Sequence, residues 1–172
     1  TKEKPKSLKP FLPYSHQKRA IKSAQNHFSQ NNESRGKLIL PCGTGKSLTA
    51  FWIAEKLNAK RILVAVPSLS LIRQTLQVWL RESYAKNWDV NWITVCSDKT
   101  VGKIDSDDLA ILAQDLGIPA LTKPKLIGKW LRKKHNGKVI VFTTYQSSKA
   151  IAEATKLAKR NFDLAIMDEA HK

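Results

Sequence analysis

Two short groups of residues in this sequence have types and spacing suited to phosphate chemistry. The first is Gly43-Thr-Gly-Lys-Ser47, whose glycines let backbone N–H groups turn inward around phosphate oxygens. A strand candidate precedes this string and a helix candidate follows it, and a helix N-terminus favours bound anions. Lys46 would reach the β- and γ-phosphates of a nucleotide, and the Ser47 hydroxyl would ligate Mg²⁺. We therefore predict that Gly43, Thr44, Gly45, Lys46 and Ser47 bind phosphate.

The general phosphate-loop pattern G-x-x-x-x-G-K-[ST] is matched only in part. Its first glycine falls on Leu40, so the strict form fails. The alternative interpretation is an ordinary glycine turn that happens to precede Lys-Ser. The position between a strand and a helix favours the phosphate site. Cys42, inside the loop, is most simply a small spacer.

The second group is a pair of adjacent carboxylates, Asp168 and Glu169, directly after the apolar run Leu164–Met167. A strand there would project Asp168 at the carboxyl edge of a sheet, where an acid can hold the Mg²⁺ that bridges nucleotide phosphates. Glu169 can then polarise the attacking water. The alternative is a helix N-cap with two solvated acids. The phosphate loop and several parallel strands earlier in the chain favour the metal and water roles.

Short apolar runs that alternate with amphipathic segments predict an α/β fold, a mostly parallel sheet with helices on both faces. Ligands bind such sheets at the carboxyl ends of the strands. Residues 1–13 predict an extended lead-in, and 97–137 an insertion whose clearest helix is Ile127–His135. The expected strands are Lys37–Leu40, Arg61–Val66, Trp92–Cys96, Lys138–Thr143 and Phe162–Met167, and the expected helices are His16–Phe28, Ser47–Leu57, Leu69–Glu82 and Ser147–Arg160.

Composition indicates a folded domain with a polyanionic partner. The 172 residues are 42% hydrophobic, and 30 Lys and Arg face 14 Asp and Glu, for a net charge of +16. Nucleic acid is the commonest partner of such a chain, and a lysine-rich surface that only aids solubility is the alternative. No apolar run approaches the roughly 20 residues of a membrane span. Cys42 and Cys96 form no metal-ligand pair and suit a reducing compartment such as the cytoplasm.

Together these residues resemble superfamily-two helicases. The resemblance implies an N-terminal RecA-like P-loop NTPase lobe over residues 14–172 that uses ATP and Mg²⁺, with the second RecA-like lobe absent from this chain. The matching segments are Leu12–Gln17 (Q motif), Pro41–Ser47 (motif I), Val66–Gln74 (motif Ia), Thr143–Ser147 (motif Ic) and Asp168–His171 (motif II, DEAH form).

Within the superfamily, the sequence looks most like the translocase part of type ISP restriction enzymes, and type I and type III enzymes share much of it. This likeness implies an ATP-driven translocase on double-stranded DNA, accompanied by nuclease and methyltransferase domains of a restriction system. The strings that carry it are Arg35–Lys46, Val95–Asp98, Phe142–Ser147 and Phe162–His171.

The family resemblance also assigns residue roles. It implies that Gln17 reads adenine, that His171 couples the nucleotide site to the neighbouring lobe, and that nucleic-acid backbone contacts come from Ser68, Arg73, Thr144 and Gln146. Simpler alternatives stay open for several of these. Gln17 could be a surface residue, Ser68 a helix cap, Arg73 an exposed helix charge, and Tyr145 a core residue.

A basic stretch and several tryptophans have two interpretations each. The stretch either tracks phosphates or forms a solvated helix face, and its members are Lys123, Lys125, Lys129, Arg132, Lys133, Lys134 and Lys138. Trp52, Trp79 and Trp130 occupy apolar helix positions and are expected in the core, while Trp88 and Trp92 are expected to pack under the insertion.

Two rival functions differ in kind from a translocase. One is a nucleic-acid-binding lobe without turnover, which the intact Lys46 and Asp168–Glu169 disfavour. The other is a P-loop phosphotransferase unrelated to nucleic acid, which the net charge and the Thr143–Ser147 segment disfavour. A salt-sensitive shift of DNA separates them, because a small-molecule kinase gives only weak nonspecific charge binding.

We expect residues 1–172 alone to bind nucleotide weakly and to hydrolyse it slowly or not at all. The family's arginine finger lies in the second lobe, and such an arginine contributes roughly 10³–10⁵ in rate. Steady-state ATPase assays with and without DNA measure this directly. A robust DNA-stimulated rate from these 172 residues alone would contradict the expectation.

Overall fold

All five strands in the described part of the chain pair in parallel within one sheet. The computed structural model describes residues 8–96 and 120–169. The strand order is β3-β2-β4-β1-β5, and the strands are β1 (Arg61–Val66), β2 (Val90–Val95), β3 (Ala120–Leu121), β4 (Lys138–Thr144) and β5 (Leu164–Met167). The predicted α/β class with a parallel sheet is confirmed.

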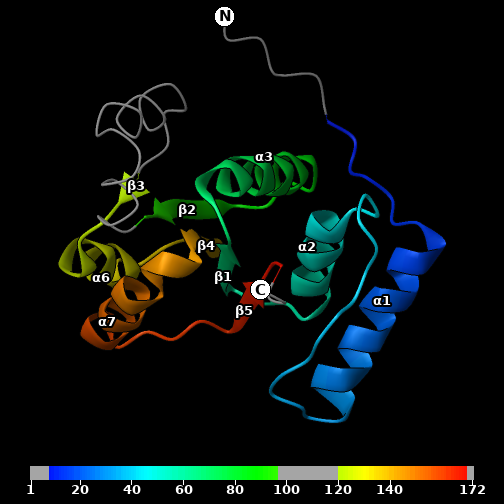
Figure 1. The fold of residues 1–172 in the computed structure, drawn as a ribbon, viewed down its shortest axis with the longest axis horizontal. Coiled ribbons are helices and arrows are strands. Elements are labelled where there is room, and N and C mark those ends of the chain that lie inside the picture. The colour runs from blue at the N-terminus through cyan, green and yellow to red at the C-terminus, as the bar shows by residue number, and fades with distance from the viewer. Residues whose placement is uncertain (1–7, 97–119, 170–172) are drawn as a thin grey trace, which may run out of the picture. The chain divides into compact units, whose positions relative to one another are not determined.

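The chain divides into two compact units. The helical unit comprises residues 1–59 and 75–88, and the sheet unit comprises residues 60–74 and 89–172. Helix α3 (Leu69–Ala85) begins in the sheet unit and ends in the helical unit. The other helices are α1 (Ser15–Gln25) and α2 (Lys46–Lys56) in the helical unit, and α6 (Pro124–Arg132) and α7 (Ser148–Ala158) in the sheet unit (Figure 1). In the described ranges no helix is long and apolar enough to cross a bilayer.

The central strands of the sheet unit are apolar on both faces, as strands of a covered parallel sheet must be. On one face Leu63 of β1 and Val141 of β4 lie side by side and are buried. On the other face their neighbours Val64 and Phe142 are buried as well. This explains why the sequence shows continuous apolar runs here and no alternation.

Helices α6 and α7 cover the Leu63–Val141 face and lie side by side (Figure 1). A Cβ placed on Gly128 of α6 would lie 3.2 Å from the Ala154 carbonyl oxygen and 3.3 Å from the Leu157 Cβ of α7. The absence of a side chain at Gly128 therefore lets the two helices approach each other closely. The shared core consists of Leu63, Ile93, Val95, Ile127, Leu131, Val141, Ile151, Ala154 and Ala158.

The helical unit is built around aromatic rings and one buried carboxylate. Phe51 of α2 stacks on Trp88 at 4.5 Å and meets Trp79 edge-on at 5.2 Å. The Glu82 side chain is fully buried and accepts hydrogen bonds from the Phe11 N–H at 3.1 and 3.2 Å. Arg81 completes this clasp with an ion pair to Glu82 at 2.9 Å. The segment before α1 is thereby attached to α3.

Three expectations about elements need correction. Residues 37–40 form no strand, and Ile39 is 80% exposed, because an apolar run becomes a strand only where a neighbouring strand completes its hydrogen bonds. The helix expected from Ile127 begins at Pro124, a residue favoured in a first helical turn, and ends at Arg132. Beyond Gln25, α1 continues as a π-turn, Asn26–Gln30.

Other expectations are confirmed or lie outside the described residues. Trp52 and Trp79 are buried, and Trp130 packs against the sheet-unit core. Residues 97–119 of the expected insertion fall outside the described ranges. Trp88 stacks on Phe51 of α2, a contact that was not predicted when Trp88 was expected to pack under the insertion.

We expect Gly128→Val to destabilise the protein by about 1–3 kcal/mol, because the new side chain would force α6 and α7 apart. Urea unfolding gives the free-energy difference. Leu126→Val is the matched control, since Leu126 is exposed on the same helix and its change is expected within about 0.5 kcal/mol. Equal stabilities for the two variants would contradict the role of Gly128.

Candidate nucleotide and nucleic-acid site

The predicted phosphate loop sits directly before α2 in the helical unit. Gly43 and Gly45 have φ angles of 75° and 76°, in the left-handed region that favours glycine. Gly45 is the N-cap of α2, and no side chain caps this helix. The Thr44 hydroxyl donates a 2.7 Å hydrogen bond to the Pro41 carbonyl and closes the loop on itself. A helix N-terminus without a side-chain cap favours a bound anion.

A buried glutamine holds the phosphate loop from outside. Gln17 is 2% exposed, and its Nε2 donates to the Thr44 carbonyl at 3.1 Å. Its Oε1 accepts the Tyr14 N–H at 2.8 Å, which is half of a capping box at the start of α1. His16 Nε2 also lies 3.3 Å from the Thr44 carbonyl oxygen. The surface role suggested for Gln17 is excluded, and both ends of its amide are occupied.

The contact with Gln17 explains why position 45 is glycine. A Cβ on Gly45 would lie 2.7 Å from Gln17 Nε2, closer than real Cβ contacts come. The positive φ angle adds a second reason, because side chains rarely adopt it. The backbone of the loop at Gly45 and the Gln17 side chain of α1 are therefore in close contact.

The residues around the loop suit a hydrated Mg²⁺. Ser47 Oγ is shielded from solvent and makes no hydrogen bond to any residue in the described ranges. A buried hydroxyl without a partner needs an explanation, and a metal ligand supplies one. Among residues 8–96 and 120–169, no group of three or more His, Cys, Asp or Glu could hold a metal ion. Metal held through nucleotide phosphates with one or two protein ligands fits this donor set.

The two predicted carboxylates lie in a turn at the carboxyl end of β5. The Asp168 N–H donates to the Ala65 carbonyl at 2.9 Å, which extends the pairing with β1 by one residue. Asp168 Oδ1 accepts the Glu169 N–H at 3.1 Å. Glu169 has a φ of 55°, a left-handed conformation that costs a non-glycine residue roughly 1–2 kcal/mol. Backbone strain of this kind is concentrated at functional sites.

Tyr145 joins this turn to the segment that follows β4. Its hydroxyl donates a hydrogen bond to the Asp168 carbonyl oxygen. Burial, with the charges of Asp168 and Glu169, raises the pKa of the Tyr145 phenol. The phenol therefore keeps its proton and stays a donor at neutral pH. Sequence reasoning left a core position open for Tyr145 within the motif Ic segment, and its hydrogen bond to Asp168 required coordinates.

The four residues proposed for nucleic-acid contact differ in exposure. Thr144 is the last residue of β4 and Gln146 follows it, while Ser68 and Arg73 follow β1, the paired neighbour of β4. Arg73 and Gln146 are exposed. Ser68 Oγ accepts the Leu71 N–H at 3.4 Å, a weak cap at the start of α3 that supports the capping alternative. Thr144 is fully buried and bonds Ser147 Oγ at 3.1 Å, which favours a structural role for its side chain.

Comparison with known proteins decides the family. Residues 11–172 match the family described as "Type III restriction enzyme, res subunit". The chain belongs to that family. It is also 31% identical over 153 residues to "Probable helicase A859L" of African swine fever virus, isolate Tick/Malawi/Lil 20-1/1983, and 30% identical to the protein of isolate Pig/Kenya/KEN-50/1950. These matches cover 88% of this chain and 15% of each viral protein.

Two solved structures share the fold of this chain. One is a nuclease-deletion mutant of the Type ISP restriction-modification enzyme LlaGI in complex with a DNA substrate mimic, with TM-score 0.73, 31% identity and 94% of this chain covered. The other is the ATP-dependent Type ISP enzyme LlaBIII bound to DNA, with TM-score 0.75, 33% identity and 95% covered. The predicted RecA-like lobe and its likeness to restriction enzymes are confirmed. The chain spans 15% and 11% of those two proteins.

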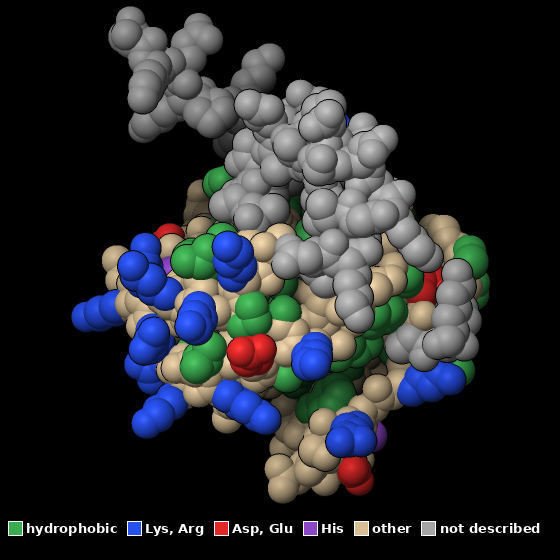
Figure 2. Space-filling view, turned by 60° about the vertical axis from the view of Figure 1, so that its left-hand side comes forward, with side chains coloured by type: hydrophobic (Ala, Val, Ile, Leu, Met, Phe, Trp, Pro, Cys, Tyr) green, Lys and Arg blue, Asp and Glu red, His purple; other side chains and the backbone are tan. Residues whose placement is uncertain are grey.

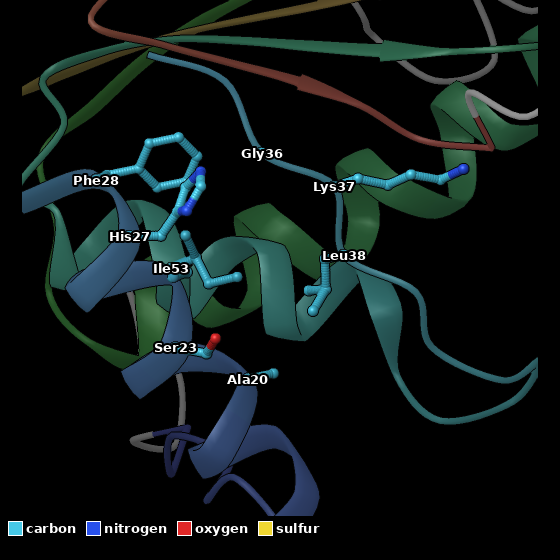
Figure 3. A pocket seen from close by; sticks show the side chains of 9 residues that line it. Ala20, Ser23, His27, Phe28, Gly36, Lys37, Leu38 and Ile53 are labelled. Carbon is cyan, nitrogen blue, oxygen red and sulfur yellow. The ribbon is translucent and has the colours of Figure 1, made fainter. Parts of the chain in front are cut away.

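A hollow of about 160 Å³ in the helical unit is separate from the predicted phosphate loop (Figure 3). None of Gln17 and Gly43–Ser47 contributes to its wall, and the side chain of Lys37 points away from His27 and Phe28. The residues predicted to bind nucleotide therefore do not form this hollow. Its lining consists of Ala20, Ser23, Ala24, His27, Phe28, Gly36, Lys37, Leu38 and Ile53.

Two expectations about the candidate site remain predictions. His171 lies outside the described residues. The approach of Lys46, in the helical unit, to Asp168 and Glu169, in the sheet unit, also stays a prediction.

We expect Gln17→Met to destabilise the protein by about 1–3 kcal/mol, because the Thr44 carbonyl and Tyr14 N–H lose their buried partner. If Gln17 positions the loop, binding of inorganic tripolyphosphate, which carries no adenine, weakens together with binding of ATP. Urea unfolding and calorimetric titration measure these effects, with the exposed Gln77→Met as control. Weakened ATP binding with unchanged tripolyphosphate binding would instead assign Gln17 to adenine.

Proposed function

We propose that this chain is the ATP-binding lobe of a DNA translocase of a restriction system and that the full-length protein hydrolyses ATP. The observation that carries the proposal is the built phosphate loop: Gln17 holds the Thr44 carbonyl, Gly45 caps α2, and Ser47 keeps a buried hydroxyl unpaired. A ligand at the loop would give this hydroxyl the partner that no described residue supplies. Membership of the restriction-enzyme family supports the same conclusion.

The proposed roles follow from the chemistry of each group. ATP with Mg²⁺ supplies the phosphoanhydride bond when bound. Lys46 binds the β- and γ-phosphates, and the first N–H groups of α2 bind phosphate oxygens. Ser47 and Asp168 would hold Mg²⁺, which would neutralise charge on the phosphates, and Glu169 would accept a proton from the attacking water. For this to work, Lys46 and the Asp168–Glu169 turn must approach across one nucleotide.

Double-stranded DNA is the proposed polymer. The solved relatives are described in complex with a DNA substrate mimic and bound to DNA, which supports this choice. In this chain, exposed Arg73 and Gln146 are the better placed of the proposed backbone contacts, and Ser68 offers its remaining hydrogen-bonding capacity. A second RecA-like lobe, coupled through His171, together with nuclease and methyltransferase domains, completes the proposed enzyme.

The chain carries a natural reporter for nucleotide binding. Cys42 is exposed within the phosphate loop, whereas Cys96 is buried. Burial raises the pKa of the Cys96 thiol to about 11, so at pH 8 it is almost entirely protonated and shielded from reagents. Alkylation at that pH therefore reports on Cys42 alone.

We expect Mg²⁺-ATP to slow the alkylation of Cys42 by iodoacetamide, because phosphates bound to the loop exclude the reagent. Peptide mass spectrometry over time gives the rate. Lys46→Ala should abolish the protection, and Lys56→Ala, at the exposed end of the same helix, should preserve it. Asp168→Asn should weaken protection only when Mg²⁺ is present. Protection that persists in Lys46→Ala would overturn the proposed site.

A further inference from the structure

The face formed by α6 and α7 carries an unusual charge imbalance. Residues 120–160 contain eleven Lys and Arg and one acid, Glu153. The ten of these basic residues that lie outside β4 make no ion pair with any residue that the structure describes. Figure 2 shows many Lys and Arg side chains and few Asp or Glu on the side it presents. Residues 120–160 therefore carry a net charge of +10, and five of their basic side chains lie on α6 and α7 themselves.

The structure arranges part of this charge as rows. On α6, Lys125, Lys129 and Arg132 stand at i, i+4 and i+7, hence on one stripe, and all three are exposed. The buried residues Ile127 and Leu131 occupy a different side of the helix. Like charges at i, i+4 repel each other, and α6 contains no acidic residue that would offset this repulsion.

Helix α7 repeats the arrangement. Lys149 and Lys156 are exposed and seven residues apart, opposite the buried Ile151 and Ala154. The close approach at Gly128 keeps the two helices in direct contact, so both rows belong to one surface. This second row was not visible in the sequence, where only the stretch around α6 stood out.

The dimensions suit a phosphate backbone. Seven helical residues rise by about 10.5 Å, and phosphates of one strand of B-DNA recur every 3.4 Å or so along the axis, so each row spans about three phosphates. Packed helices lie roughly 8–10 Å apart, which places the second row within reach of the same duplex. Lysine and arginine tips on flexible stems bind phosphates without reading bases.

We propose that the outer face of α6 and α7 binds the phosphate backbone of duplex DNA, as a contact surface additional to the loops that follow β1 and β4. The inference rests on the proposed DNA function and extends it. The surface supplies affinity that is independent of sequence and holds the duplex while the strand-end loops change contacts. The residues that form it are Lys125, Lys129 and Arg132 of α6 and Lys149 and Lys156 of α7.

The test is fluorescence anisotropy of a labelled duplex with the 172-residue chain over a range of salt. The variant Lys125→Gln/Lys129→Gln/Arg132→Gln should bind more weakly at low salt. Its slope of log affinity against log salt should be shallower by about 2.7, at about 0.9 for each lost phosphate contact. The loss should be equal for two unrelated duplex sequences, and Lys149→Gln/Lys156→Gln should lower the slope by about 1.8.

The matched control is Lys18→Gln/Arg19→Gln/Lys22→Gln, which removes the same three charges from exposed positions of α1. It should leave the slope unchanged, and circular dichroism with urea unfolding checks that every variant is folded. Equal losses in the α1 and α6 variants would reduce the effect to net charge and overturn the proposal. Unchanged binding in the α6 and α7 variants would also overturn it and leave the face to an acidic protein surface.

Failure of this proposal is separable from failure of the proposed function. If the chain binds duplex DNA and only the α6 and α7 variants behave as wild type, the additional surface falls and the DNA function stands. If the chain binds no duplex at low salt, both DNA assignments fall. Protection of Cys42 by nucleotide is an independent readout of the ATP site in either case.

Discussion

Parallel pairing of β4, β1 and β5 is the constraint on which the sheet-unit site depends. Because parallel strands end at the same edge, the residues after these three strands must lie together whatever their separation in sequence. The pairing of Val66 with Thr144 and of Ala65 with Met167 sets their order along that edge. Between their first residues and the Thr143–Thr144 end of β4, these strands are apolar. Their contribution is to fix where the loops begin.

The phosphate loop depends on a different kind of interaction, a single buried amide. Gln17 satisfies an N–H at the start of α1 and a carbonyl in the loop with the two ends of one side chain. The Glu82–Arg81 clasp fixes the segment that precedes Tyr14 in the same way, through a buried carboxylate. Buried polar groups of this kind are costly unless fully paired, and when paired they specify one geometry. A loop made largely of glycine and small residues needs such external supports.

Much of the fold could be predicted from the sequence, and the reasons for success and failure are physical. Arg61–Val66 was correct in full because a β-branched run between turn residues has few alternatives. Leu38 and Ile39 looked equally apolar, yet a strand also requires a partner, which composition cannot supply. Gly45 was predicted as a phosphate-loop glycine, but its contact with Gln17, 28 positions earlier, required coordinates. Thr144 and Tyr145 stand next to each other, and only packing revealed that the first is buried while the second reaches Asp168.

The contact between Tyr145 and Asp168 bears on how two ligands could influence each other. Tyr145 lies between the buried Thr144 and the exposed Gln146. A shift of the Gln146 backbone would therefore also displace the backbone of Tyr145. Its hydroxyl bonds the carbonyl of Asp168, the residue before the strained Glu169. The turn is also held by the hydrogen bonds from the Asp168 N–H to the Ala65 carbonyl and from the Glu169 N–H to Asp168 Oδ1. Coupling between two sites requires an element with two states, and the hydrogen bond between Tyr145 and Asp168 is the contact through which the segment after β4 reaches the turn after β5.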